Sequence, residues 1–529
     1  MKKSHTGGAE MTQLKTFITS KFSYILLSII YISTQLPILT RFPFVHSDET
    51  WLSGLSRNIM ETGSYAVTEA FFDLYPRHPH AIKSLFHTLQ IIFIKAFGYE
   101  IFSIRLLSFL FGLLTLFFFH RLCTRIFDSK PLALVATLLL AMDIQFIYAS
   151  HFARQEIIVL FVLIFSLNFF ARSLPNMKLV HHLALGMIIG MSIGLHPNSF
   201  IICLPIVFLY IFHIAFTKKL KLADLFVYIA PVTAFALVFI ALSLCFDANF
   251  IANYTQFGSQ FGVNHSLSAK LAEIPNYYSK LFYGISGTYY TPNIQLEFYL
   301  FAIVLVASIV FLLITGQKKM KEIFISIILI IVAINIGIIL IGRYSQPSIV
   351  FLIPFLYLLV TFVLTFIRKN IRICLAILLL FLITTNSVLN ALPYLNHSYA
   401  GYLQEIGKVV EKDDIVLANL NAEMYFDNGK LFDYRNLAYL QEHNLTFEEY
   451  IESNQIAYII YPEEMDFLYE NRLIWNDFYG DISLYYEDMQ SFLQTKSQLV
   501  YQFSEPSYGM RIARYINQKD WQIRIYKVN

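Results

Sequence analysis

Two adjacent carboxylates, Asp48 and Glu49, directly follow the first apolar run of the chain, in the stretch "TRFPFVHSDETWLSGLSRNIMETGSY" of residues 40–65. Carboxylates are costly beside hydrocarbon, so a pair of them at this position needs a reason. One reason is structural, because with Ser47 as N-cap and Gly63 as C-terminal stop both acids complement a helix dipole. The other is catalytic, since a carboxylate can take a proton from a reacting hydroxyl group.

A third acid lies in "YASHFARQEIIVLF", residues 148–161, a short link between two apolar runs that also contains His151 and Arg154. Glu156 falls at the expected membrane boundary. Ionisable groups there usually face protein or a water-filled cavity, which makes them candidates for function. A surface ion pair between Arg154 and Glu156, or simple snorkelling to the membrane surface, explains the same residues.

A basic cluster occurs in "DLYPRHPHAIKS", with Arg77, His78, His80 and Lys83. Such a cluster suits a phosphate or diphosphate whose hydrophobic tail lies in the bilayer. The alternative is nonspecific attraction to anionic lipid headgroups. Two histidines one residue apart are too weak a pattern to predict a metal site.

Three more polar residues lie at or near the ends of apolar runs. Arg343 and Tyr344 occur in "IGRYSQPSIVFLIP", and Arg105 occurs in "IFSIRLLSFL". Each arginine is either a second phosphate ligand or an anchor that snorkels to the membrane surface.

The composition indicates what must position these residues. The chain has 529 residues, of which 57% are hydrophobic and only 14% are charged, which is typical of an integral membrane protein. The net charge of +3 gives no reason to expect a nucleic-acid partner. About eleven runs are predicted to span the membrane: 22–40, 101–120, 132–150, 157–172, 180–195, 198–217, 222–246, 297–315, 323–342, 348–367 and 373–391.

Basic residues predict the orientation of these spans. Lysine and arginine cluster in alternate connections, which the positive-inside rule assigns to the cytoplasm. The clusters are Lys2, Lys3, Lys15 and Lys21; Arg121, Arg125 and Lys130; Arg172 and Lys178; Lys218, Lys219 and Lys221; Lys318, Lys319 and Lys321; and Arg368, Lys369 and Arg372. We therefore expect a cytoplasmic N-terminus and an extracytoplasmic C-terminus in the cytoplasmic membrane.

The pattern holds only if "SLFHTLQIIFIKAFG", residues 84–98, does not cross the membrane, so we expect a horizontal or re-entrant amphipathic helix there. With Trp51, Leu55 and Ile59 as an apolar stripe, the helix after Asp48 is also expected to lie along the membrane. The first outer loop then covers about 41–100, and a second covers about 247–296.

The last part of the chain, 395–529, has the composition of a soluble domain. The segments "DDIVLANL", "QIAYIIYPEEMD" and "WQIRIYKV" are typical of strands. We therefore predict two domains: a membrane domain over 1–394 and an extracytoplasmic α/β domain over 395–529.

These motifs resemble those of the GT-C superfamily of membrane glycosyltransferases, in the branch of the protein O-mannosyltransferases and the bacterial lipid A aminoarabinose transferase. That branch has an Asp-Glu pair after the first span, here in "HSDETWLSGLSRNIMETGSY", followed by elements that resemble "RHPHAIKSLFHTLQIIFIKAFG" and "SIRLLSFLFG". A later acid corresponds to Glu156, and a late "R-Y-x-x-P" element corresponds to "RYSQP". His78-Pro79 replaces the usual "P-P" or "K-P", and the second acid is commonly Asp, which leaves the donor headgroup and metal use open.

The resemblance implies an inverting transfer of a sugar from a polyprenyl-phosphate donor to a hydroxyl group of a lipid, glycan or protein. Asp48 would be the base, Glu49 its support, and Glu156 would position the acceptor or the sugar. Mg²⁺ or Mn²⁺, if a divalent ion is used, would bind Asp48 and Glu156, and no other cofactor is expected. The implied substrate-binding residues are Arg77, His78, His80, Lys83, Arg105, His151, Arg154, Arg343 and Tyr344.

Two other functions fit the sequence. One is a GT-C glycan ligase or an oligosaccharyltransferase-like enzyme that transfers a whole glycan. The other is a lipid transporter of the cell envelope. The interiors of the predicted spans are nearly free of charge, which favours an enzyme over a transporter with ionisable groups at the membrane midplane.

Overall fold

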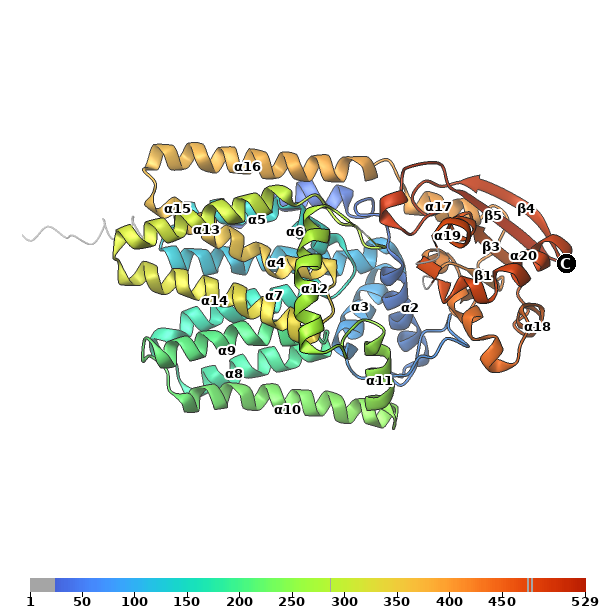
Figure 1. Ribbon diagram of the computed structural model, residues 1–529, viewed down its shortest axis with the longest axis horizontal. Helices are drawn as coiled ribbons and strands as arrows, with labels where there is room; N and C mark the ends of the chain where they lie inside the picture. The colour runs from blue at the N-terminus through green and yellow to red at the C-terminus, as the bar shows by residue number, and fades with distance from the viewer. Residues whose placement is uncertain (1–23, 286, 473–474, 477–478) are drawn as a thin grey trace, which may run out of the picture.

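The computed structural model describes residues 24–285, 287–472, 475–476 and 479–529. It consists of a bundle of long helices with a mixed α/β domain at one end (Figure 1). This architecture confirms the predicted class of a multi-pass helical membrane protein with a C-terminal α/β domain. The basic residues Lys2, Lys3, Lys15 and Lys21, and the first two positions of the first predicted span, lie outside the described residues.

Within the described residues, seven helical segments are long and apolar enough to cross a membrane. They contain α4 (Ile101–Phe127), α7 (Glu156–Ser173), α10 (Leu222–Phe246), α13 (Gln295–Thr315), α14 (Lys318–Ile341), α15 (Ile353–Phe366) and α16 (Lys369–Ala391). Three shorter apolar helical segments occupy further predicted spans: Tyr24–Ile38, Leu179–Gly194, which contains α8 (Leu179–Met191), and Ser199–Ala215, which is α9.

The predicted span 132–150 is not one straight helix. It consists of α5 (Lys130–Ala141) and α6 (Ile144–His151), which are bent by 64° relative to each other. Asp143 lies at the break, where its carboxylate caps α6 by accepting hydrogen bonds from the backbone N–H groups of Gln145 (2.8 Å) and Phe146 (3.0 Å). The hydroxyl group of Tyr357 donates to the same carboxylate at 2.7 Å. A helix therefore starts inside the apolar run because a buried acid caps it there.

The two predicted outer loops contain helices and lie at the end of the bundle that carries the α/β domain (Figure 1). The first loop contains α2 (Ser47–Thr62) and α3 (Ser84–Phe97), and α3 is the short helix predicted for 84–98. At 14 residues it is too short to span hydrocarbon. The second loop contains α11 (Phe250–Ser259) and α12 (Leu267–Phe282), which the sequence did not predict.

Helix α2 begins and ends close to the predicted positions, but its cap differs. The N-cap is His46 rather than Ser47: the His46 Nδ1 atom accepts a hydrogen bond from the backbone N–H of Asp48 at 2.9 Å. In return, Glu49 accepts from the backbone N–H of His46 at 3.0 Å, which completes a capping box. Gly63 ends the helix with φ +70°, a conformation that favours glycine.

Two residues of the predicted apolar stripe of α2 pack against protein. The Trp51 ring packs edge-on against Phe72 at 5.1 Å between ring centroids, and the guanidinium of Arg435, from the C-terminal domain, lies over it at 4.8 Å. Ile59 is buried, whereas Leu55, the third residue of the stripe, is half-buried.

The described part of the C-terminal domain contains a five-stranded sheet of order β2-β1-β3-β5-β4. Strand β1 is parallel to β2 and β3, whereas β5 is antiparallel to β3 and β4. The strands are β1 (Val416–Ala418), β2 (Leu431–Asp433), β3 (Tyr458–Pro462), β4 (Ser497–Ser504) and β5 (Gln522–Val528), and the helices are α17 (Tyr399–Ile406), α18 (Phe447–Ser453), α19 (Glu464–Asn471) and α20 (Tyr486–Thr495). The sequence predicted β1, β3 and β5.

One side-chain amide of the C-terminal domain makes four of the hydrogen bonds that hold the first outer loop. The Asn436 Nδ2 atom donates to the carbonyl of Phe71 at 3.0 Å. Its Oδ1 atom accepts from three successive backbone N–H groups, those of Asp73 (3.2 Å), Leu74 (3.3 Å) and Tyr75 (3.1 Å). This loop leads directly into the basic cluster, so the amide fixes where that cluster begins.

We expect Asn436→Ala to loosen this loop, because the backbone N–H groups of Asp73 and Tyr75 lose their acceptor, while that of Leu74 keeps Asp73 Oδ1. The loss should be roughly 2 kcal/mol, seen as faster proteolysis in 66–83 and a lower unfolding temperature in detergent. Asn428→Ala is the matched control, since Asn428 makes a single bond across the same interface, to Asn58 at 3.0 Å. Equal proteolysis of both variants would contradict the role of Asn436.

Candidate functional site

A cavity of about 440 Å³ lies at the end of the bundle next to the C-terminal domain. Helices α2 and α11, the start of α3, and the links that precede α7, precede α9 and follow α14 all contribute to its wall. Its main polar lining residues are Asp48, Glu69, Arg77, His80, Lys83, Arg154, Gln155, His196, Asn198, Tyr289 and Arg343. Residues from distant parts of the sequence therefore meet at one membrane face.

Of the three acids predicted as site residues, Asp48 is the one that reaches this cavity. Its Oδ2 atom accepts hydrogen bonds from Arg154 Nη1 at 2.8 Å and from the Tyr289 hydroxyl group at 2.7 Å, and its side chain is 25% exposed. Burial raises the pKa of this carboxyl, but Arg154, His46 and Tyr289 outweigh burial and hold the pKa well below its usual range. Asp48 is therefore an ionised acceptor at neutral pH.

Glu49 points away from the cavity and forms a buried ion pair. Its two oxygens accept from Arg105 Nε at 2.8 Å and Nη2 at 2.7 Å, and neither side chain is exposed. Glu49 also accepts from the backbone N–H of Ala153, and Arg105 donates to backbone carbonyls within 39–44. The predictions that Glu49 is catalytic and that Arg105 binds substrate are corrected accordingly, because neither group is accessible to a ligand.

Glu156 does not line the cavity, but it is paired with Arg154, which does. Glu156 is the first residue of α7 and is 3% exposed. Its Oε1 atom forms an ion pair with Arg154 Nη2 at 3.0 Å. The same guanidinium pairs with Asp48, so Arg154 stands between the two acids that were predicted as metal ligands. The guanidinium of Arg154 lies between these two carboxylates, in the place that a divalent cation bound by both would need. In the described part of the chain, no group of three or more His, Cys, Asp or Glu residues could hold a metal ion.

Two cations of the cavity wall have no anionic partner. Neither Lys83 Nζ nor the Arg343 guanidinium makes a hydrogen bond or ion pair with any described residue, and the guanidinium lies over the ring of Phe261 at 4.3 Å. Burial lowers the pKa of Lys83 to about 7, and repulsion from Arg343 and Arg154 adds to this effect. Uncompensated charges that face a cavity favour an anionic ligand.

Arg77, from the same basic cluster, is already paired. Its Nε and Nη2 atoms donate to the two oxygens of Glu69 at 3.0 and 2.9 Å, and its guanidinium lies between the rings of Trp51 (5.2 Å) and Phe257 (4.9 Å). Burial raises the pKa of Glu69, but Arg77 outweighs burial and lowers it to about 2. Arg77 therefore forms part of the cavity wall, and its charge is already compensated by Glu69.

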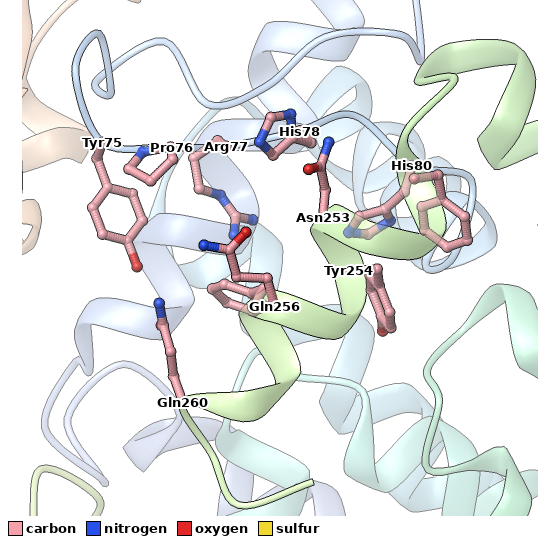
Figure 2. A pocket seen from close by; sticks show the side chains of 11 residues that line it. Tyr75, Pro76, Arg77, His78, His80, Asn253, Tyr254, Gln256 and Gln260 are labelled. Atoms are coloured by element: carbon pink, nitrogen blue, oxygen red, sulfur yellow. The ribbon is translucent and has the colours of Figure 1, made fainter. Parts of the chain in front are cut away.

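A smaller pocket of about 70 Å³ adjoins the cavity (Figure 2). The two share Arg77, His80, Tyr254 and Phe257 as a common wall. His78 lines this smaller pocket but not the cavity, and its Nδ1 atom is 3.8 Å from Asp247 Oδ2. Figure 2 shows the amides of Gln256 and Gln260 on the α11 side, opposite the Tyr75 to His78 segment.

Comparison with known proteins identifies the fold. Residues 83–244 match the sequence model of the family described as dolichyl-phosphate-mannose-protein mannosyltransferase. The apo oligosaccharyltransferase of Archaeoglobus fulgidus aligns with a TM-score of 0.54 and 12% identity over 86% of this chain and 71% of that one. ArnT of Cupriavidus metallidurans, bound to undecaprenyl phosphate, aligns with a TM-score of 0.52 and 12% identity over 94% and 97% of the two chains. The chain has the GT-C fold. No curated protein sequence matches it.

Besides Glu49, His78, Arg105 and Glu156, two further predicted site residues lie outside the cavity wall. His151 is buried, with its Nδ1 atom 2.9 Å from the carbonyl of Phe42, and the Tyr344 hydroxyl group donates to the carbonyl of Lys270. Neither is positioned to contact a ligand of this cavity.

The structure also adds residues that the sequence analysis missed: His46, Glu69, His196, Asn198 and Tyr289. His196 and Asn198 occur in "GLHPNSF" at the outer end of a predicted span, a polar stretch that could have been noticed. Tyr289 lies in a loop rich in tyrosine, so nothing in the sequence distinguished it.

Glu49→Gln should destabilise the protein much more than Asp48→Asn. The glutamine leaves the buried guanidinium of Arg105 without a counter-charge, a defect that typically costs about 3 kcal/mol or more. Asp48 is partly exposed, so its amide variant should unfold within a few degrees of the wild type. Thermal unfolding of both variants in one detergent measures the difference, and equal unfolding temperatures would refute the structural role of Glu49.

Proposed function

We propose that this protein is an inverting glycosyltransferase that moves a sugar from a polyprenyl-phosphate donor to a hydroxyl acceptor. The observation that carries the proposal is one cavity that joins an ionised, partly exposed carboxylate, Asp48, to two cations without anionic partners, Lys83 and Arg343. The names of the similar proteins support a lipid phosphate: the matching family is named for dolichyl-phosphate-mannose, and ArnT was solved with undecaprenyl phosphate.

In the proposed reaction, the lipid phosphate of the donor lies against Lys83 and Arg343. The acceptor oxygen attacks the anomeric carbon from the side opposite the phosphate, and the bond from that carbon to the phosphate oxygen breaks. The electron pair leaves on the lipid phosphate, where the two cations stabilise the growing negative charge. The hydroxyl proton passes to Asp48, and the configuration of the sugar is inverted.

Arg154 links the base to the anion site. While it pairs with Asp48, that carboxylate has a low pKa and is a weak base. A donor phosphate in the same cavity competes for the charge of Arg154, which raises the pKa of Asp48 as the donor binds. The acid then becomes a better proton acceptor only in the loaded site, and Tyr289 still orients it.

The acceptor is proposed to approach from the side of the α/β domain, past the smaller pocket with Gln256 and Gln260. This end is proposed to be extracytoplasmic, because the predicted cytoplasmic connections carry the clusters of lysine and arginine. A hydroxyl group on a lipid, a glycan or a protein satisfies the chemistry. No step passes through a metal ion, since Arg154 occupies the place between Asp48 and Glu156.

Asp48→Asn should reduce sugar transfer by about 100-fold or more, because the amide cannot accept the proton. Transfer is measured in vesicles from radiolabelled dolichyl- or undecaprenyl-phosphate mannose, with cell-envelope extract as acceptor. Asp73→Asn is the matched control, since that outer-loop carboxylate bonds Tyr450 and Asn454 of the C-terminal domain instead. Near-normal transfer by Asp48→Asn, with a donor that the wild type uses, would reject the role of Asp48.

Donor binding should weaken as the pH rises, because the pKa of Lys83 is about 7 in the ligand-free cavity. Below that pH the lysine is charged and attracts the phosphate, and above it the charge is lost. From pH 6.5 to 8.5 the affinity for dolichyl-phosphate mannose should fall by about tenfold. This phosphodiester headgroup does not titrate in that range. Lys83→Arg keeps its charge and should bind with little pH dependence, whereas a fall as steep as that of the wild type would exclude Lys83 as its source.

A further inference from the structure

A second cavity, of about 290 Å³, lies between α4, α7, α9, α14 and α15. It lies near the C-terminal ends of α4, α7 and α9 and the N-terminal end of α14. The α9–α10 and α13–α14 connections place these ends at the side of the bundle away from the α/β domain (Figure 1). The cavity is therefore at the membrane face opposite Asp48 and belongs to no part of the site described above.

Most of its wall is hydrocarbon. Leucine, isoleucine and phenylalanine side chains from all five helices line it, among them Leu122, Leu167, Leu209, Ile327 and Leu358. Such a wall offers water almost no hydrogen-bond partners, so water is a poor occupant. An acyl chain, which surrounds the helices in any bilayer, fits the chemistry of this wall.

The polar end of the cavity carries more positive than negative charge. Its charged residues are Arg125, Lys219, Lys319 and Glu322. Lys219 is neutralised by Glu322, with 3.0 Å between Nζ and Oε2. Arg125 donates only to the side chain and backbone oxygens of Asn168, which carry no charge, and Lys319 has no partner among the described residues. Two positive charges are thus left for a ligand.

We propose that this cavity is a binding site for an anionic phospholipid. The phosphate would contact Arg125 and Lys319, and one acyl chain would fill the apolar slot. A basic pocket between membrane helices on the face with the basic connections is the expected form of such a site. A zwitterionic lipid would bring its own cation toward the two positive side chains, and free phosphate would leave the slot unfilled. The proposal does not depend on the sugar-transfer reaction.

Native mass spectrometry of the purified full chain tests the site, with phosphatidylglycerol and phosphatidylcholine of identical acyl chains as probes. The wild type should retain phosphatidylglycerol in preference. Lys319→Ala and Arg125→Gln should each lower its affinity by about fivefold. Lys318→Ala is the matched control, because Lys318 is the neighbouring lysine and does not line the cavity.

A second variant tests the apolar slot separately. Ile323→Trp should fill part of the slot and displace the lipid while the basic side chains remain, and its unfolding temperature reports whether the bundle is intact. Lys319 is exposed, so its variant should fold as the wild type does. Equal retention of the two lipids, unchanged affinity in both charge variants, or displacement of the lipid by inorganic phosphate at equal concentration would overturn the proposal.

Discussion

The buried ion pair between Glu49 and Arg105 is the interaction on which the site depends. Two charges removed from water cost several kcal/mol each, and the cost is offset only when the geometry is good and the remaining donors and acceptors are satisfied. Here the backbone of 39–44 and the N–H of Ala153 satisfy them. One pair therefore joins the chain before α2, the start of α2, helix α4 and the link before α7.

Asp48 takes its position from that pair. Successive residues of a helix point about 100° apart, because a turn contains 3.6 residues. When Glu49 is fixed toward the bundle, its neighbour is directed toward the cavity, where Arg154 and Tyr289 hold it. The two acids therefore have different roles. Glu49 completes the capping box of the helix, and Asp48 faces the cavity.

The sequence predicted features that depend on local pattern, and it missed those that depend on tertiary pairing. Apolar run length predicted the seven segments of the described chain that are long and apolar enough to cross a membrane, but not the break at Asp143. Run length and the distribution of lysine and arginine were also enough to bring Asp48, Lys83 and Arg343 to one face. The partners of these residues were not predictable, because Tyr289 is 241 positions away from Asp48 and nothing local marks it. Strands β2 and β4 were both missed, and β4 is mostly exposed, so it has no long apolar run to mark it.

The C-terminal domain shapes the cavity although none of its described residues lines it. Trp51 forms part of the cavity wall and has a guanidinium near its ring from each domain, Arg77 at 5.2 Å and Arg435 at 4.8 Å. Arg77 is in turn fixed by Glu69, which also accepts from the indole N–H of Trp51. A shift of the C-terminal domain would remove one of the two cations from the ring, which Glu69 and Phe72 would still hold. The domain therefore contacts the cavity wall at Trp51 and, through Asn436, the loop that leads into the basic cluster, so its position is coupled to the shape of the wall near Asp48.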